Sequence, residues 1–322
     1  MNYEEDKPIS YCGIFGIYGS ETASAQAYYG LHALQHRGQE ASGIVTRSFN
    51  GDNRAHFNII KGEGLVSEVF ADHNLLTDVL FGDSAIGHNR YSTTGSSKSR
   101  KNIQPFMVNY RMGNLAIGHN GNLTNAKELR EELVNEGAIF QTTSDTEVIL
   151  HLIARSKLDN QIDQIMEALR RIEGAYCLVI LTDDKLIAAR DPLGFRPLSL
   201  GKLEDAFLVA SETCAFDIQR AEFLREVEAG EMIVIDDESI KTKVIKSFRI
   251  KEVPEPQKHC VFEYIYFSRP DSFIFGHNVD KMRRRLGKEL ARSHPVTDPD
   301  GERVYVISVP DSSNTTALGY AR

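Results

Sequence analysis

Short runs of apolar residues, each ended by Gly, Asn or Asp, recur through the first 240 residues and predict β-strands. The close spacing of these runs indicates antiparallel strands joined by short connections. The predicted strands cover residues 12–18, 42–46, 85–90, 115–119, 176–182, 186–190, 207–211 and 231–235.

Apolar residues at helical spacing predict helices over residues 27–34, 127–134 and 162–169 and a further helix after Ser144. Strands outnumber helices, and the helices come in adjacent pairs instead of alternating with strands. This order favours an α+β fold, with layers around antiparallel sheets, over a doubly wound parallel sheet.

The pattern changes at residues 246–257, where Pro254 and Pro256 lie among charges without any hydrophobic period. We interpret 246–260 as a linker to a second unit, residues 261–322. That unit has a basic helix at 279–292, an apolar strand at 304–309 and a Ser/Thr-rich turn that enters a helix. Because these elements cannot enclose a core by themselves, we expect them to be part of an incomplete larger domain.

Composition then limits the class of protein. The 322 residues are 41% hydrophobic and 25% charged, which is typical of a globular protein. The net charge of -8 argues against general affinity for nucleic acid or an anionic membrane. We find neither an apolar stretch of roughly 20 residues nor a leader with a basic start. The four cysteines are widely spaced, which fits a reducing compartment, so we expect a cytoplasmic protein.

Cys12 opens the first predicted strand, after a polar and acidic segment, residues 1–11. Removal of that segment as a propeptide would leave Cys12 with a free α-amine, whose pKa is about 8. The amine could then take the thiol proton, so that one residue supplies both the nucleophile and the base. A small buried thiol in a first strand is the structural alternative.

Three further segments carry candidate chemistry. Arg90 ends an apolar strand, and its planar guanidinium suits a carboxylate. Asn120 and Gly121 follow another strand and could hold an oxyanion, although Asn-Gly also favours a tight turn. Residues 144–147 (SDTE) predict a capping box with Ser144 as the N-cap, which leaves the Asp145 carboxylate free for an ammonium group.

Read together, these motifs resemble the class II glutamine amidotransferases, which are amino-terminal-nucleophile hydrolases. Further motifs narrow the resemblance to the amidophosphoribosyltransferase family. The motifs are CGIFG at 12–16, HRGQE at 36–40, GHNRYST at 87–93, HNGN at 119–122 and SDTE at 144–147, with RDPLGFRPL at 190–198, ASETCA at 210–215 and FEYIYFSRPDS at 262–272.

The resemblance implies a fold and a division into domains. The fold would be a four-layer αββα hydrolase domain with two antiparallel sheets, followed by the start of an α/β phosphoribosyltransferase domain. The domains would be a propeptide, a type 2 glutamine amidotransferase domain, a linker and an incomplete phosphoribosyltransferase domain, at residues 1–11, 12–245, 246–260 and 261–322.

The resemblance also implies roles in the splitting of glutamine. Cys12 would be the nucleophile, with its α-amine as base, and Asn120 and Gly121 would hold the oxyanion. A γ-glutamyl thioester would form and ammonia would leave before water releases glutamate.

Further residues would recognise the substrate. Arg90 would bind the α-carboxylate of glutamine and Asp145 its α-ammonium, while Arg37 and Thr93 would shape the pocket. In a complete enzyme, the ammonia would pass to phosphoribosyl pyrophosphate, giving 5-phosphoribosylamine and pyrophosphate in the first committed step of purine synthesis.

For the second unit, the resemblance suggests that Ser312 and Ser313 lie near a pyrophosphate and that Cys260 could be one ligand of a [4Fe-4S] cluster. The phosphoribosyl step would use Mg²⁺, whereas glutamine hydrolysis would need no cofactor. The full-length enzyme would be a homo-oligomer. Two alternatives stay open: a class II glutaminase that serves another acceptor such as a sugar phosphate, and a truncated, non-catalytic binding or assembly module.

Overall fold

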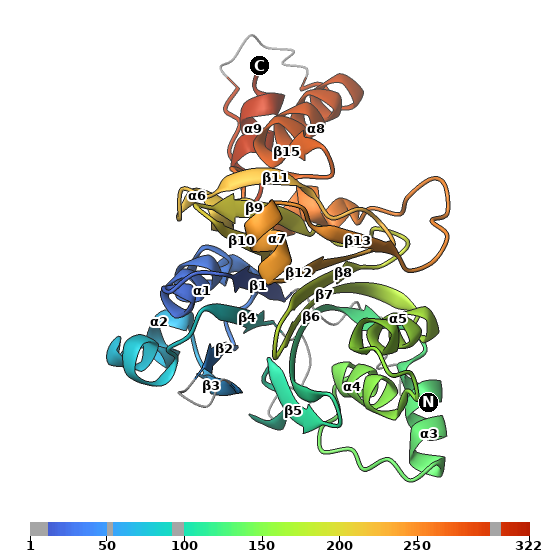
Figure 1. Ribbon diagram of the computed structural model, residues 1–322. Coiled ribbons are helices and arrows are strands. Elements are labelled where there is room, and N and C mark those ends of the chain that lie inside the picture. Colours follow the sequence, from blue (N-terminus) through green and yellow to red (C-terminus); the bar gives the residue numbers. More distant parts are fainter. Residues whose placement is uncertain (1–11, 50–53, 92–99, 297–303) are drawn as a thin grey trace.

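The computed structural model describes residues 12–49, 54–91, 100–296 and 304–322. Two antiparallel sheets form the centre of the molecule (Figure 1). The first sheet has seven strands in the order β11-β9-β10-β1-β4-β2-β3. Its strands are β1 (Gly13–Tyr18), β2 (Ala41–Phe49), β3 (Ala55–Glu63), β4 (Ser84–Arg90), β9 (Ser199–Leu203), β10 (Ala206–Ala210) and β11 (Glu222–Glu226).

The second sheet has six strands in the order β13-β12-β8-β7-β6-β5. β6 pairs with the whole length of β7, from Leu115 opposite Thr182 to Leu123 opposite Gly174. The strands are β5 (Phe106–Tyr110), β6 (Gly113–Leu123), β7 (Gly174–Thr182), β8 (Leu186–Arg190), β12 (Glu231–Ile235) and β13 (Lys246–Arg249).

Three apolar cores separate the layers, because alternate residues of each strand point to opposite faces. In β1, Phe15 and Ile17 pack toward helices, whereas Ile14 joins the core between the two sheets. Helices cover the outer face of each sheet, which gives four layers and confirms the predicted α+β architecture (Figure 1). The covering helices are α1 (Ala23–Ala33), α2 (Val66–Val69) and α6 (Cys214–Asp217) on the first sheet, and α3 (Ala126–Asn135), α4 (Thr146–Arg155) and α5 (Gln161–Arg171) on the second.

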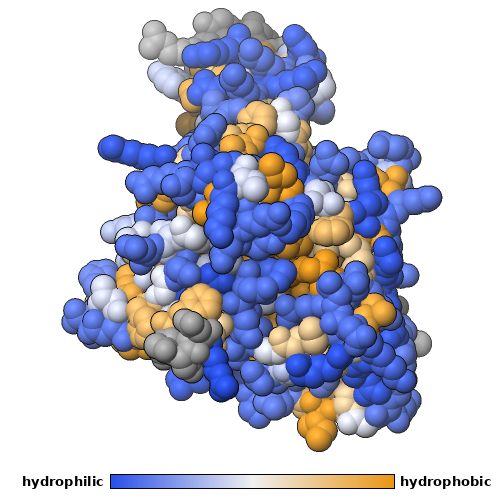
Figure 2. Space-filling model, viewed as in Figure 1, coloured by the Kyte–Doolittle hydropathy of each residue, from blue (hydrophilic) through white to orange (hydrophobic). Residues whose placement is uncertain are grey.

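The remaining elements of the main body are short. They are α7 (Asp237–Thr242) and the helical turns η1 (Gln35–Arg37), η2 (Leu75–Val79) and η4 (Arg100–Asn102). None of the helices in the described ranges is both long enough and apolar enough to cross a bilayer. The face shown in Figure 2 is largely hydrophilic, with apolar side chains gathered in small groups.

Residues beyond β13 form a smaller unit at one end of the molecule (Figure 1). Its helices α8 and α9 pack so closely that a Cβ at Gly287 would lie 2.0 Å from the Thr316 carbonyl oxygen, and one at Gly319 would lie 2.1 Å from the Arg284 carbonyl oxygen. Its elements are η5 (Glu263–Phe267), β14 (Phe273–Ile274), β15 (His277–Asn278), α8 (Val279–Ser293) and α9 (Asn314–Tyr320).

Two expectations for this region differ from the structure. The strand predicted at 304–309 is wrong: these residues form no strand, and Ile307 and Val309 are 89% and 79% exposed. An apolar run becomes a strand only beside a partner strand, and none of the described residues pairs with it. The predicted linker also begins inside the second sheet, because residues 246–249 form β13. The domain boundaries stay predictions.

Candidate active site

Cys12 lies directly before β1 and is buried, with 4% of its surface exposed. Burial raises the pKa of the Cys12 thiol to about 11, although the Tyr91 backbone and the nearby Arg90 and Arg37 charges favour the thiolate. The thiol is therefore protonated at neutral pH and needs a base beside it to act as a nucleophile. Residues 1–11, whose removal would expose such a base, lie outside the described residues.

Asn120 lies in β6, opposite Cys177 of β7, and is fully buried. Neither its Nδ2 nor its Oδ1 has a hydrogen-bond partner among the described residues. A buried amide without partners costs about 1–3 kcal/mol, so such a group calls for an explanation, and service to a ligand is one.

Gly121 follows Asn120 at a place where no side chain fits. A Cβ there would lie 2.0 Å from the Ala175 carbonyl oxygen of β7 and 2.8 Å from Nε2 of His119. Glycine therefore lets β6 and β7 stay paired next to Asn120.

The strand of Asn120 is held against the strand that leads from Cys12. Ile14 pairs with His88 of β4, and Nε2 of His88 lies 3.1 Å from the carbonyl oxygen of His119. Because His119 directly precedes Asn120, this contact joins the two sheets at the level of the candidate site.

Asp145 is the N-cap residue of α4, and its carboxylate faces β6. It accepts a hydrogen bond from the Leu123 N–H at 2.9 Å, and its Oδ1 lies 3.7 Å from Nδ1 of His119. Burial disfavours the charged form, but His119 and the Leu123 N–H outweigh it and lower the pKa of Asp145. A charged carboxylate in this position suits an ammonium group.

The predicted capping box is wrong. The helix begins at Thr146, so Asp145 takes the N-cap position expected for Ser144. Glu147 instead accepts hydrogen bonds from the backbone N–H groups of Gln141 and Thr142, at 2.7 and 2.8 Å. The carboxylate therefore satisfies the loop before the helix and not the helix start.

Arg90 is the last residue of β4 and is half-buried. Within the described ranges its guanidinium has no carboxylate within ion-pair distance, while its charge acts on the Cys12 thiol. A cation so placed can receive a carboxylate from a ligand. Thr93, which was expected to shape the same pocket, lies outside the described residues.

Arg37 contacts the backbone of Cys12, and its side chain is fully buried. Its Nε donates to the Cys12 carbonyl oxygen at 3.2 Å, and its two Nη atoms donate to Glu212 and Glu263. Burial opposes the charge, but the two carboxylates raise the pKa of Arg37. The contribution of Arg37 to a glutamine pocket stays a prediction.

Glu212 and Glu263 are residues to which sequence reasoning assigned no role. Both stand inside quoted motifs, yet only the fold reveals that they meet at Arg37, 175 and 226 residues away along the chain. Their pKa values are lowered, because the arginines and His36 outweigh the effect of burial.

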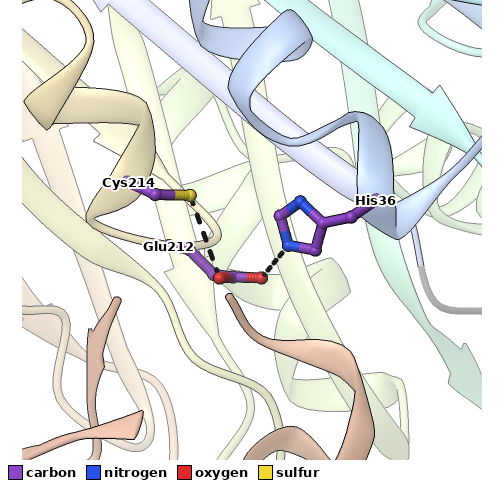
Figure 3. Close-up of side chains that lie close together, drawn as sticks. All are labelled: His36, Glu212 and Cys214. Atoms are coloured by element: carbon purple, nitrogen blue, oxygen red, sulfur yellow. Dashed lines mark hydrogen bonds and ion pairs between the residues drawn. The ribbon is translucent and has the colours of Figure 1, made fainter. Parts of the chain in front are cut away.

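His36, Glu212 and Cys214 lie close enough together to suggest a metal site (Figure 3). Their surroundings argue against one. Glu212 already accepts hydrogen bonds from Arg37, from the Arg269 N–H and from the Ser272 hydroxyl. Cys214 Sγ itself lies 3.9 Å from Oε2 of Glu212 and 3.8 Å from the Ala33 carbonyl oxygen, within reach of both as a weak donor. We interpret this group as part of an ion-pair network.

The remaining candidates lie away from Cys12. Cys260 is half-buried, with its Sγ 3.8 Å from Nη1 of Arg196, and belongs to no group of three possible metal ligands among the described residues. Ser312 and Ser313 lie in the turn before α9, where Ser313 donates to the Val309 carbonyl. Cluster binding by Cys260 and phosphate binding by these serines stay predictions.

Known proteins resemble this chain closely. A family model described as a glutamine amidotransferase domain matches residues 88–217, which include Arg90, Asn120 and Asp145 but not Cys12. Amidophosphoribosyltransferase 2, chloroplastic, of Arabidopsis thaliana is 49% identical over 318 residues, which are 98% of this chain and 54% of that protein. The amidophosphoribosyltransferase of Bacillus subtilis is 48% identical over 96% of this chain and 61% of its own length.

Two solved structures share the fold. One, titled as the structure of the allosteric regulatory enzyme of purine biosynthesis, aligns with a TM-score of 0.87 and 48% identity over 96% of this chain and 63% of that chain. The other is the glutamine phosphoribosylpyrophosphate amidotransferase of B. subtilis complexed with ADP and GMP, with a TM-score of 0.84 and 46% identity over the same shares.

The chain spans between 53% and 65% of the length of the curated relatives named for this activity. Within that span, sequence and fold agree along nearly the whole chain. The chain therefore belongs to the amidophosphoribosyltransferase family.

Proposed function

We propose that this chain hydrolyses glutamine to glutamate and ammonia with Cys12 as the nucleophile. The observation that carries the proposal is the buried side chain of Asn120, whose amide has no partner among the described residues. A preorganised donor of this kind stabilises the negative charge that develops on a carbonyl oxygen under attack. Cys12, Arg90 and Asp145 surround the same region with a thiol, a cation and an anion.

Glutamine would bind through its α-carboxylate to Arg90 and through its α-ammonium to Asp145. This places the side-chain amide toward Cys12, with the carbonyl oxygen directed at the Nδ2 of Asn120 and the backbone of Gly121. Charge complementarity at both ends would select a free amino acid over a peptide, which lacks one or both charges.

The reaction would then proceed in two steps. The Cys12 α-amine takes the thiol proton, and the sulfur bonds to the amide carbon to form a tetrahedral oxyanion. Collapse of the oxyanion breaks the C–N bond, and the amine returns the proton to the nitrogen, which leaves as ammonia. Water attacks the thioester by the same route, which releases glutamate and restores the thiol.

The acceptor of the ammonia belongs to the same proposal. The relatives are named amidophosphoribosyltransferases, which favours phosphoribosyl pyrophosphate over another sugar phosphate as the acceptor. We infer that Mg²⁺ serves that step and that the complete protein forms homo-oligomers. A cytoplasmic location belongs to the same proposal, and in the full-length protein Cys260 would supply one ligand of a [4Fe-4S] cluster whose other ligands are not among the described residues.

The proposal is tested at Asn120. Asn120→Ala should lower kcat for ammonia release from glutamine by about 10²–10³-fold, as loss of one oxyanion donor does in other hydrolases. KM should change little, because the contact forms only in the transition state. An Asn120→Ala protein that is folded and hydrolyses glutamine at the wild-type kcat would refute the proposed site.

A further inference from the structure

The buried network around Arg37 joins Cys12 to a segment more than 250 residues away in sequence. Arg37 comes from η1 and makes contact with the Cys12 backbone through its Nε, at 3.2 Å from the carbonyl oxygen. Its Nη1 and Nη2 donate to Glu263 at 2.9 and 2.8 Å, so that the guanidinium lies between residue 12 and η5.

Glu263 is itself held firmly. Its Oε1 accepts from Nη1 of Arg196 at 3.0 Å, and its Oε2 accepts from the Ser268 hydroxyl at 2.8 Å. The side chains of Glu263 and Arg37 have no exposed surface. With both carboxylate oxygens occupied, Glu263 fixes the plane and the position of the Arg37 guanidinium.

Glu212 is a second acceptor for the same arginine. It binds Arg37 through Oε1, while its Oε2 accepts from the Arg269 N–H at 2.9 Å and from the Ser272 hydroxyl at 2.6 Å. Residues 263–272 therefore contact this centre twice, through Glu263 and through the bonds to Glu212. The two arginines and the two carboxylates balance in charge, so removal of one partner leaves a buried charge without compensation.

We propose that Glu263 is a positioning residue for Cys12, which acts through Arg37, so that the geometry of the nucleophile depends on the seating of residues 263–272. The proposal rests on the proposed function of Cys12. If Glu263 loses its charge, Arg37 turns toward Glu212, and the bond from its Nε to the Cys12 carbonyl weakens. The sulfur, which is fixed to the same residue, then moves relative to the oxyanion site.

The first test compares Glu263→Gln with a matched control, Glu231→Gln. Glu231 is also a largely buried carboxylate that binds an arginine with both oxygens, at 2.8 Å to each Nη atom of Arg225, and it has no contact with Arg37 or Cys12 among the described residues. Both substitutions should lower the thermal midpoint. Only Glu263→Gln should lower kcat for glutamine hydrolysis, by about 10- to 100-fold, with KM changed less than about threefold.

The second test needs no glutamine. Carbonyl-¹³C cysteine labels the four cysteines, and the Cys12 signal is the one that disappears in Cys12→Ala. We expect the Cys12 carbonyl shift to change in Glu263→Gln and to stay unchanged in Glu231→Gln. Should Glu263→Gln fail to fold, Ser268→Ala removes one donor to Glu263 and should move the same signal by a smaller amount.

The outcomes separate the two proposals. A wild-type protein that releases no ammonia would refute the proposed function, while the carbonyl shift would still decide the role of Glu263. An unchanged Cys12 carbonyl signal in Glu263→Gln, or an equal loss of kcat in Glu231→Gln, would overturn the positioning role.

Discussion

The side chains of the candidate site differ in protonation and hydrogen bonding, because each has different surroundings. The Cys12 thiol is kept protonated by burial, whereas the Asp145 carboxylate is kept charged by His119 and the Leu123 N–H. Asn120 is neutral and has no partner among the residues that the structure describes. These side chains supply a thiol, an anion and a free amide, and the thiol needs a base beside it before its sulfur can attack an amide carbon.

Asp145 gives a prediction at the residue scale. Asp145→Asn keeps an acceptor for the Leu123 N–H but removes the negative charge, so glutamine should bind more weakly. We expect KM for glutamine to rise by about tenfold or more, since a hydrogen bond to a charged group contributes about 1.5–3 kcal/mol. Steady-state kinetics of ammonia release measures this KM. An unchanged KM would show that Asp145 does not bind the ammonium group of glutamine.

Most of the proposed site could be predicted from short motifs, because Cys12, Asn120 and Asp145 each stand in a distinctive local sequence. The network behind Cys12 could not. Arg37, Glu212 and Glu263 meet only after the chain has folded, and a lone Glu in a motif carries no signal of its distant partner. Pairing across such distances is a property of topology and not of local pattern.

At the scale of elements, strands buried on both faces were predicted well, because they carry continuous apolar runs. All strands predicted within the first 240 residues overlap observed ones, such as β7 and β12. The strands at the sheet edges were missed, and so was the interior strand β9. β13 (KSFR) is exposed throughout and holds one large apolar residue, and β5 (FMVNY) has an apolar run of only three residues, so neither gives a strong apolar signal.

The start of α4 provides a prediction for an element. Glu147→Ala should reduce the free energy of unfolding by about 2–3 kcal/mol, because it leaves the N–H groups of Gln141 and Thr142 without their charged acceptor. Ser144→Ala should cost less, about 1 kcal/mol at most, since the Ser144 hydroxyl accepts a single long hydrogen bond, from the Thr146 N–H at 3.3 Å. Urea unfolding measures both free energies. A larger loss of stability in Ser144→Ala than in Glu147→Ala would contradict this account of the helix start and support a capping box.

At the scale of the whole molecule, two sheets place the candidate site where their strands β1, β4 and β6 meet. The smaller unit is connected to this body through the buried carboxylates Glu212 and Glu263. Under the proposed role of Glu263, stability and activity share one network, and its charge state should govern both.

This network predicts how stability depends on pH. The pKa values of Glu212 and Glu263 are lower in the folded than in the unfolded chain, so their contribution is present above the ordinary glutamate pKa and is lost as pH falls below it. Asp191 acts in the opposite direction, because burial raises its pKa to about 6. We expect the two glutamates to dominate, with a loss of about 2–3 kcal/mol or more between pH 5 and pH 3. Urea unfolding across this range measures it; rising stability on acidification would contradict the assignment.

The most direct test of the central claim combines glutamine hydrolysis with the intact mass of the protein. We predict that wild-type protein beginning at Cys12 releases glutamate and ammonia in equal amounts. Folded Cys12→Ala should lose at least about 10³-fold in rate. A protein that still carries residues 1–11 and hydrolyses glutamine at the full rate, or an equally active Cys12→Ala variant, would contradict the account.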